Sequence, residues 1–520
     1  MKLANFVQGR WVEGTGPGTP LIDPVLGTEL ARASTEGVDL KAALDYARRT
    51  GGPALRKLSY GERAALLGKI VEVLNANKDR YQATALANSG NTKIDAAIDI
   101  DGGSGTLFYY SRLGAKLGDK RALRDGAFDR LGKDEAFQAM HIAAPLQGVA
   151  IHINAFNFPS WGLWEKAAVA LLAGVPVLAK PATATALLSY QMVKEVIDAG
   201  VLPAGALSLI CGSARDLLDH VTGQDAIAFT GSADTAAMLR SNRHVIESGA
   251  RFNVEADSLN SSLLGPDASD GSPEFDLFVR EVAREMTQKA GQKCTAIRRA
   301  FVPKALVDKI AGALEARLAK TVVGNPRSES VTMGPVVNRT QQKAVLDAIA
   351  KLRGEARTVL GGEAKPVDAD PGIGCFVAPT LLRCDDPASA KAVHSVEAFG
   401  PACTLMPYDS PDQAIALAAK GGGSLAASVF TGDDKFAADA ALGLAASHGR
   451  VLVIDEKVGK SSTGHGIVMP MCVHGGPGRA GGGEELGGIR GLRFYHQRLA
   501  VQGRLDRLQA LAANAAEVSL

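Results

Sequence analysis

The sequence has 520 residues, of which 46% are hydrophobic and 22% are charged. This length is too great for one compact core and is enough for about two or three domains, and the composition is that of an ordinary globular protein. The 57 basic and 55 acidic side chains leave a formal net charge of +2, and no polybasic run stands out. Neither a nucleic acid nor an anionic membrane is therefore expected as a partner.

Cysteine usage and the apolar segments favour a cytoplasmic protein. The six cysteines show neither CxxC spacing nor the spacing of metal ligands, so no metal site is expected. Few, scattered thiols fit a reducing compartment, in which a single cysteine can be a nucleophile. Residues 1–6 lack the long apolar core of a secretion signal, and the most apolar stretch, Ala167–Ala179, is too short to span a bilayer.

The first half of the chain predicts helices and turn-rich strands up to residue 130, with an amphipathic helix at Tyr60–Asn77. Between residues 148 and 255, apolar strand-like runs alternate with helical patterns. The expected strands are Gly148–Ile153, Val175–Ala179, Leu207–Ile210, Ala226–Phe229 and Phe252–Val254. The expected helices are Ser160–Ala173, Thr185–Ala199, Ala214–Thr222 and Ala233–Ser248. This alternation predicts a parallel doubly wound α/β sheet, whose ligands bind at the carboxyl ends of the strands.

A second α/β pattern occupies residues 259–460 and includes a predicted helix at Phe275–Lys289. The chain then becomes glycine-rich from Gly464 to Gly491, and a polar helix is expected at Leu499–Ala513. The segment Gly476–Gly481 spells G-x-G-x-x-G, but no clear helix follows it. Because a dinucleotide-binding turn requires a strand, a turn and a helix in that order, this segment is interpreted as a loop instead.

Five short motifs contain the residues that could react or bind a ligand. They are Asn157-Phe158-Pro159, Lys180-Pro181, Phe229-Thr230-Gly231-Ser232, Gly291-Gln292-Lys293-Cys294 and Glu397-Ala398-Phe399-Gly400-Pro401. Cys294 follows a predicted helix and stands among small polar residues, where a thiol can be exposed and reactive. Taken singly, each motif also has an ordinary interpretation: a buried thiol, a turn asparagine, a solvated lysine or a surface glutamate.

In this order the motifs resemble those of the aldehyde dehydrogenase superfamily, and the resemblance spans nearly the whole chain. It implies that Cys294 attacks an aldehyde, that Asn157 donates to the oxyanion, and that hydride transfer to a nicotinamide cofactor leaves a thioester. It also implies the aldehyde dehydrogenase fold: an α/β protein with doubly wound parallel sheets in the cofactor and catalytic domains and a small β arm for oligomerisation, as a homodimer or tetramer. The implied boundaries are 1–130 and 148–258 for the dinucleotide-binding domain, 259–463 for the catalytic domain, and 131–147 with 486–520 for oligomerisation.

The same resemblance assigns the cofactor contacts. Lys180, followed by Pro181, would bind the adenosine ribose. In the stretch 229–232, Gly231 would let the backbone approach the pyrophosphate at the positive N-terminus of the following helix. Glu397 would hold the nicotinamide ribose, with Phe399 packed beside the ring.

Thr183 decides the expected cofactor. In the family, the third residue after the ribose-binding lysine is often a glutamate that binds both adenosine ribose hydroxyls, and here that residue is Thr183. Without the carboxylate, a 2′-phosphate escapes like-charge repulsion, the threonine hydroxyl can donate to it, and Lys180 supplies positive charge. NADP is therefore expected, with NAD as the alternative, and Thr183 is also compatible with a simple helix N-cap.

The expected general base is Glu255. It stands where the family usually has L-E-L-G-G, but here the sequence is Val254-Glu255-Ala256-Asp257-Ser258, without the glycines. A carboxylate in a cleft near a thiol can have a raised pKa and activate water, and its presence favours hydrolysis over deacylation by CoA. Asp257 is the rival base and could instead be structural. The nine histidines, including His474, are expected to be ordinary surface or core residues.

The residues around Glu255 and Cys294 resemble those of a narrower group of dehydrogenases within the superfamily. They resemble the dehydrogenase domain of ring-opening enzymes in aerobic phenylacetyl-CoA degradation and the free-standing enzymes of benzoyl-CoA degradation. The former usually carry a C-terminal hydratase domain, for which this chain has no room. The resemblance implies a small-molecule aldehyde linked to CoA, 3,4-didehydroadipyl-CoA semialdehyde, that is oxidised to the CoA-linked acid. The alternatives are another free or CoA-linked semialdehyde and, from other classes, a cofactor-independent cysteine hydrolase or a non-catalytic scaffold.

Overall fold

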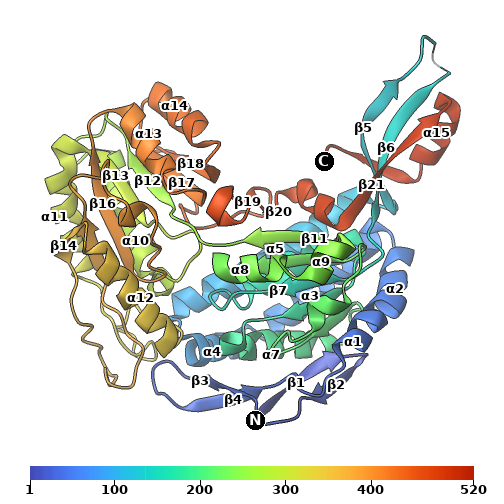
Figure 1. The fold of residues 1–520 in the computed structure, drawn as a ribbon, viewed down its shortest axis with the longest axis horizontal. Helices are drawn as coiled ribbons and strands as arrows, with labels where there is room; N and C mark the ends of the chain where they lie inside the picture. Colours follow the sequence, from blue (N-terminus) through green and yellow to red (C-terminus); the bar gives the residue numbers. More distant parts are fainter. Residues whose placement is uncertain (135) are drawn as a thin grey trace.

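A computed structural model describes residues 1–134 and 136–520, which form two α/β bodies and a β arm that projects from one of them (Figure 1). The first body contains a nine-stranded sheet in the order β11-β10-β7-β8-β9-β1-β4-β3, with β2 paired to β1. Its strands are β1 (Lys2–Val7), β2 (Arg10–Glu13), β3 (Thr19–Ile22), β4 (Glu29–Ala33), β7 (Ala150–Ile153), β8 (Val177–Lys180), β9 (Leu207–Leu209), β10 (Ala226–Thr230) and β11 (Arg251–Glu255). Strands β7 to β11 pair in parallel, as the alternating pattern predicted.

Helices cover both faces of this sheet. They are α1 (Leu40–Tyr46), α2 (Gly52–Lys57), α3 (Tyr60–Ala76), α4 (Lys78–Ser89), α5 (Lys93–Leu117), α6 (Trp161–Ala173), α7 (Ala186–Asp198), α8 (Ala233–Arg240) and α9 (Arg243–Ser248). Within β8, Val177 and Ala179 pack into the core beneath α3, α5 and α6, whereas Leu178 packs into the core beneath α1, α8 and α9. Alternate residues of a strand point to opposite faces, so this division makes the sheet doubly wound.

The second body repeats this design with a seven-stranded sheet in the order β14-β15-β16-β13-β12-β17-β18. Its strands are β12 (Ser261–Leu264), β13 (Arg299–Pro303), β14 (Arg357–Leu360), β15 (Thr380–Arg383), β16 (Ala402–Tyr408), β17 (Ser424–Phe430) and β18 (His448–Ile454). Only the edge pair β14–β15 is antiparallel among the pairings described in this sheet. Its helices are α10 (Pro273–Thr287), α11 (Val307–Leu318), α12 (Arg339–Leu352), α13 (Pro411–Ala419) and α14 (Asp434–Leu444).

The arm is a four-stranded sheet in the order β21-β6-β5-β22. It consists of β5 (Ala122–Arg130), β6 (Gln138–Pro145), β21 (His496–Gly503) and β22 (Ala515–Val518), with α15 (Leu505–Ala512). The boundary expected at residue 130 is therefore too late, because β5 already pairs with β6 in this sheet. The helix expected from Leu499 is also wrong at its start: Leu499–Gly503 pairs with β6, so a long-range partner prevails over the local helical pattern.

Two other predicted helices needed correction. At Ala214–Thr222 the chain forms only a 3-10 turn over Leu217–His220, and Arg215 has a φ of 41°, which is incompatible with a continuous helix. The helix expected at Ala233–Ser248 is divided into α8 and α9 because the Asn242 side chain accepts from Val245 N and starts a new helix.

The glycine-rich segment forms a short hairpin between the two bodies (Figure 1). Strand β19 (Val473–Gly475) packs against β18, and β20 (Glu484–Leu486) packs against β11. Strand β20, rather than a helix, follows the G-x-G-x-x-G segment, which confirms that the segment is not a dinucleotide-binding turn. Across the described residues, no helix is both long and apolar enough to cross a membrane.

Candidate active site

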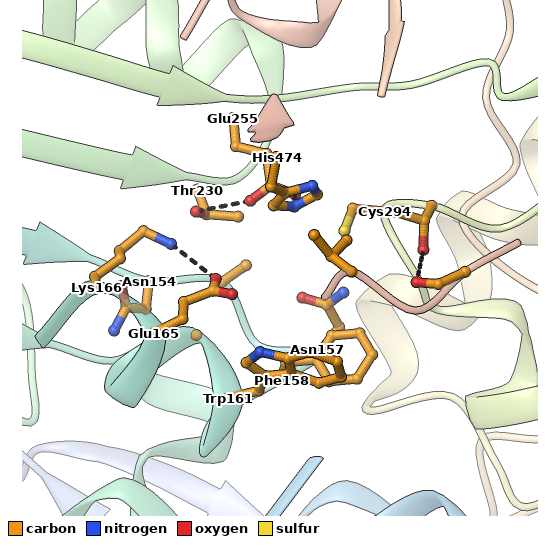
Figure 2. A pocket seen from close by; sticks show the side chains of 15 residues that line it. Asn154, Asn157, Phe158, Trp161, Glu165, Lys166, Thr230, Glu255, Cys294 and His474 are labelled. Atoms are coloured by element: carbon orange, nitrogen blue, oxygen red, sulfur yellow. Dashed lines mark hydrogen bonds and ion pairs between the residues drawn. The ribbon is translucent and has the colours of Figure 1, made fainter. Parts of the chain in front are cut away.

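The carboxyl ends of β7, β10 and β11 form one edge of the first sheet. The three strands are parallel and in register, and Thr230 at the end of β10 pairs with Glu255 at the end of β11. Asn157 lies in the loop that follows β7. Cys294 reaches the same place from the second body, so residues distant in sequence line one pocket, whose empty volume of about 510 Å³ includes space open to solvent (Figure 2).

The Cys294 loop is held in an unusual backbone conformation. Lys289, Ala290 and Gly291 have φ values of 54°, 51° and 68° just before it. A Cβ at Gly291 would lie 2.1 Å from the carbonyl oxygen of Gly400, so only glycine allows this close approach of two loops. The Asn260 side chain donates to the Cys294 carbonyl at 2.7 Å and to the Ala296 carbonyl at 2.9 Å, which fixes the position of the thiol.

The thiol of Cys294 lies in an environment that disfavours its charged form. Burial raises its pKa well above the usual value, and the neighbouring carboxylate of Glu255 raises it further. The side chain is nevertheless only partly shielded and faces the pocket. Formation of a thiolate at neutral pH therefore depends on a change in the charges around it.

Glu255 is 3% exposed and has two polar neighbours. The Thr230 hydroxyl donates to Oε2 at 3.3 Å, and Nε2 of His474 lies 3.1 Å from Oε1. Burial alone would raise the pKa of Glu255, but the charges of His474 and Lys166 outweigh burial and lower it. The expected raised pKa is thus wrong for this arrangement: the lowered pKa keeps the carboxylate ionised but makes it a weaker base.

The expectation that His474 is an ordinary residue is also wrong. His474 lies on β19, is buried, and pairs with Glu255 at the pocket wall (Figure 2). Burial lowers its pKa, but Glu255 raises it by more, so the net shift is upward. No spacing relates His474 to Cys294; the one available signal was the glycine-rich segment that contains it. A hydrogen bond from Ala256 N to the Ala480 carbonyl at 3.0 Å helps to hold that segment against β11.

Asp257 occupies a different position from its rival Glu255. Its Oδ1 accepts from the backbone N–H of Ala233 at 3.0 Å at the start of α8, and its Oδ2 is 3.7 Å from Arg479. It lines the neighbouring cleft rather than the pocket around Cys294. This geometry favours the structural interpretation of Asp257 and leaves Glu255 as the carboxylate beside the thiol.

The amide of Asn157 is directed toward the thiol side of the pocket (Figure 2). Its side chain is buried and has no hydrogen-bond partner among the described residues. Phe158 and Trp161 form the apolar wall beside it, with ring centroids 5.8 Å apart. The amide is thus free to donate to an oxygen atom that develops charge in the pocket.

A buried ion cluster lies behind Glu255, and sequence analysis missed it. Nζ of Lys166 is 3.3 Å from Glu165 and 3.0 Å from Glu485. Lys166 and Glu165 are consecutive residues of α6, whereas Glu485 comes from β20. Each of them could pass for a surface charge in the sequence, because the contacts arise only when the hairpin packs against the first body.

A second and larger cleft adjoins the pocket, with an empty volume of about 2130 Å³ that is partly open to solvent. Residues that follow β8 and β10 line it together with two residues of the loop before β16, namely Lys180, Thr183, Phe229, Thr230, Gly231, Ser232, Glu397 and Phe399. Pro181 directly follows Lys180 at the end of β8 and is buried behind this surface. Ser232 caps α8 by accepting from Thr235 N, and Asp257 accepts from Ala233 N, so the first turn of α8 borders the cleft with two of its N–H groups already bonded.

The structure adds detail on two residues of this cleft, Thr183 and Gly231. Thr183 caps no helix: the N-cap of the 3-10 turn Thr183–Thr185 is Ala182, and the N-cap of α7 is Thr185. A Cβ at Gly231 would lie 2.5 Å from the Phe229 ring, so this ring already requires a glycine there.

Glu397 and Phe399 are held by Arg298, another residue that sequence analysis missed. Oε2 of Glu397 accepts from Ser258 N at 3.0 Å, and Oε1 is 3.5 Å from Nε of Arg298. The Arg298 guanidinium also donates to the carbonyls of Gly400 and Gly291 and lies 5.4 Å from the Phe399 ring centroid. Burial raises the pKa of Glu397 to about 7, although Arg298 acts in the opposite direction.

The pocket and the cleft meet at the thiol. Asn157, Thr230, Glu255 and Cys294 line both. A group bound in the cleft and a small molecule bound in the pocket would therefore approach each other beside a thiol, a carboxylate and a free amide. This arrangement suits a covalent reaction in two stages, with a second reactant supplied from the cleft.

Comparison with known proteins identifies the family. Residues 11–501 match the model of the aldehyde dehydrogenase family. The chain belongs to the aldehyde dehydrogenase family. It is an NAD(P)-dependent aldehyde oxidoreductase, and both the fold and the family expected from the sequence motifs are confirmed.

The chain is also similar to individual members of the aldehyde dehydrogenase family. The chain is 53% identical over 479 residues to 3,4-dehydroadipyl-CoA semialdehyde dehydrogenase of Aromatoleum evansii, covering 92% of this chain and 93% of the relative. It is 27% identical to α-ketoglutaric semialdehyde dehydrogenase of Bacillus subtilis, covering 82% and 85% of the two chains. Among solved structures, lactaldehyde dehydrogenase of Escherichia coli has a TM-score of 0.83 at 22% identity, over 97% of this chain and 99% of the other. Betaine aldehyde dehydrogenase of Staphylococcus aureus in complex with NAD+ has a TM-score of 0.82 at 21% identity, over 96% and 95%.

Proposed function

We propose that this aldehyde dehydrogenase oxidises 3,4-didehydroadipyl-CoA semialdehyde to the CoA-linked carboxylic acid with NADP, in the cytoplasm. The observation that carries the chemistry is the junction of pocket and cleft at Cys294, where Glu255 and Asn157 also lie. The observation that carries the substrate is the 53% identity to a relative named for this semialdehyde.

The residues of the pocket would act in sequence. The Cys294 thiolate attacks the aldehyde carbon, and the side-chain amide of Asn157 and the Cys294 backbone N–H donate to the oxyanion that forms. A nicotinamide dinucleotide held by Lys180, Gly231 and Glu397 of the cleft would supply the hydride acceptor, so that the thiohemiacetal on Cys294 loses hydride and becomes a thioester. Glu255 then removes a proton from water as the water oxygen attacks the thioester carbon, and the acid and the free thiol are released.

The cleft offers suitable groups for a dinucleotide. The N-terminus of α8 and the small side chains at Gly231 and Ser232 suit a pyrophosphate. Glu397, held by Ser258 and Arg298, can accept from ribose hydroxyls. These residues thus fit the nicotinamide dinucleotides that the family uses.

NADP is favoured at the adenosine end. Lys180 lies at the end of β8, and Thr183 lines the cleft with its hydroxyl unused in helix capping. A threonine and a lysine there provide one donor and one positive charge without the carboxylate that would repel a 2′-phosphate. NAD remains the alternative cofactor.

The arm supports a further part of the proposal, a homodimer or tetramer. The arm projects from the first body as one sheet of the four strands β21, β6, β5 and β22 (Figure 1). Leu131, Phe137, Leu499 and Leu511 are exposed apolar side chains on or beside these strands. Such side chains suit burial against a second copy of the chain. The segments 131–147 and 486–520, extended to include β5, would serve this role.

The deciding experiment compares substrates that differ only in CoA. Initial rates of cofactor reduction are measured with the CoA-linked semialdehyde, with the corresponding free semialdehyde acid, and with short aliphatic aldehydes. A much higher kcat/KM for the CoA-linked substrate is expected, because remote binding energy positions the reacting carbon. Equal efficiency on short free aldehydes would remove the substrate proposal and leave the family assignment intact.

A further inference from the structure

Three metal-ligating side chains converge at the bottom of the pocket. The Sγ of Cys294, a carboxylate oxygen of Glu255 and a ring nitrogen of His474 all lie within 4.8 Å of one another. They come from separate segments: the loop before β13, the end of β11, and β19. A thiolate, an imidazole and a carboxylate are ligands that zinc prefers, and three protein ligands with one open position are typical of an accessible zinc site.

The spacing of the donor atoms suits a small tetrahedral ion. Zinc–ligand bonds of about 2.0–2.3 Å place neighbouring ligand atoms roughly 3.5 Å apart. Nε2 of His474 is already 3.1 Å from Oε1 of Glu255. That oxygen is buried, and it faces the His474 ring in this ion pair. The Cys294 sulfur lies within 4.8 Å of both of these donors, and its side chain is only partly shielded.

The surrounding charges also favour a cation at this point. Lys166 already neutralises the acidic pair behind the pocket, because it contacts both Glu165 and Glu485. Those two carboxylates and Glu255 also lie close enough together to hold an ion, but the ammonium group occupies that place. Among the described residues, no ammonium group forms an ion pair with the Glu255 carboxylate beside the Cys294 sulfur. A thiolate and a carboxylate side by side repel each other, and a divalent cation between them removes this repulsion.

We propose that Zn²⁺ or a similar divalent cation of intermediate softness binds reversibly to Cys294, Glu255 and His474 and blocks the pocket. On binding, the Cys294 thiol loses its proton to solvent and forms a sulfur–metal bond. His474 binds through a neutral nitrogen and releases any proton that it carried. The fourth position of the ion faces the pocket and holds water.

Zinc would act as a switch on the enzyme. The loaded form has neither its thiol nor its carboxylate available, so it does not oxidise aldehyde, and a chelator restores activity. This inhibition rests on the proposed function of Cys294 and Glu255. The binding of the ion itself does not, because it depends only on the donor atoms.

The experiment uses metal-free full-length protein and Co²⁺ as a spectroscopic probe. Titration should give a near-ultraviolet thiolate-to-cobalt absorption and visible bands of tetrahedral cobalt, which saturate at one equivalent. Added Zn²⁺ should abolish both, and its Kd is obtained by competition with a chromophoric chelator. Cys294→Ser should lose the thiolate absorption. His474→Phe should weaken zinc binding on the order of 100-fold, at least as much as the loss of an outer-shell partner does.

The exposed Cys472 provides the matched control, because it lies two residues before His474 and is the rival thiol. Cys472→Ser should retain one equivalent of metal and an unchanged Kd. Thiolate absorption that persists in Cys294→Ser, or zinc affinity that is unchanged in His474→Phe, would overturn the proposal. Thermal unfolding of the metal-free variants checks that they are folded. If His474→Phe is unfolded, the thiolate absorption of Cys294→Ser alone tests the proposed site. Zinc binding without aldehyde oxidation would remove only the proposed function, and oxidation without zinc binding would remove only this site.

Discussion

The pocket around Cys294 and the cleft that adjoins it differ in size and in how strongly their lining residues interact. The cleft is wide, and the strand-end motifs that line it each occupy a few consecutive residues, as at 180–183 and 229–232. The pocket is small, and its charged groups interlock: Glu255 with His474, and Lys166 with Glu165 and Glu485. Groups in water interact weakly, whereas buried charges determine each other's ionisation. Substitutions in the pocket should therefore change rates greatly, and substitutions in the cleft should change cofactor choice modestly.

The largest effect is expected from Cys294→Ala. Aldehyde oxidation should be abolished, because no other described thiol lines the pocket. Cofactor affinity should be unchanged, since the cleft residues lie on other segments, and fluorescence titration with cofactor measures it. A variant that keeps more than a few per cent of the wild-type rate would rule out the covalent mechanism.

Glu255→Gln should slow turnover by roughly 100- to 10,000-fold, the range of general base catalysis. Hydride transfer should suffer less, because the Glu255 carboxylate itself raises the pKa of the Cys294 thiol, and its removal favours the thiolate. Stopped-flow absorbance should show a burst of reduced cofactor followed by slow turnover.

Two other outcomes for Glu255→Gln are informative. Equal loss of burst and turnover would assign Glu255 to activation of the thiol instead. Normal turnover would exclude it as the base. Asp257→Asn serves as the comparison, and it should leave the burst and the hydrolysis step close to wild type because Asp257 caps α8 outside the pocket.

Asn157→Ala should reduce kcat by about 100- to 1000-fold, the cost of removing one oxyanion donor. Asn157→Asp is the matched variant: it keeps the shape but places a negative charge beside the oxyanion, so it should be at least as slow. A loss that appears in KM with kcat unchanged would show that Asn157 binds substrate rather than stabilising the transition state.

In the cleft, Thr183→Glu should reverse the cofactor preference. The added carboxylate repels a 2′-phosphate and can bind ribose hydroxyls, so kcat/KM for NADP should fall about tenfold or more while that for NAD rises. Thr183→Gln has the same size without charge and should change the NADP value much less. A wild-type enzyme that prefers NAD would contradict the NADP proposal before any substitution is made.

The smallest effect concerns pH. Burial raises the pKa of Glu397 to about 7, so this carboxyl is protonated below that pH and ionised above it. A carboxylate accepts more strongly from ribose hydroxyls than a carboxylic acid does, by about 1 kcal/mol. Cofactor affinity should therefore rise about fivefold as the pH rises through 7. In Glu397→Gln this pH dependence should disappear; its persistence would place the titrating group elsewhere.

The comparison of the two regions also shows which features could be predicted from the sequence and which could not. The alternation at residues 148–255 was enough to predict the parallel sheet, because the apolar strand runs show in the local pattern even though the helices expected at Ala214–Thr222 and Ala233–Ser248 needed correction. The motifs at the ends of β8 and β10 were enough to predict that Lys180 and residues 229–232 line the cleft, since parallel strands bring their carboxyl ends to one edge. Predictions were wrong where a distant segment intervened, as at Leu499–Gly503, which pairs with β6.

The sequence by itself determined the family, the doubly wound sheets, and the candidate roles of Cys294, Glu255 and Asn157. The sheets needed only the local alternation of strands and helices, and the family and the candidate roles needed only short motifs in a fixed order. The tertiary structure alone decided that His474 stands beside Glu255, that Arg298 holds Glu397, and that the Glu255 pKa is lowered rather than raised. A pKa depends on burial and on charges within a few ångströms, and nothing in the linear order of residues records which charge the β19–β20 hairpin brings to β11.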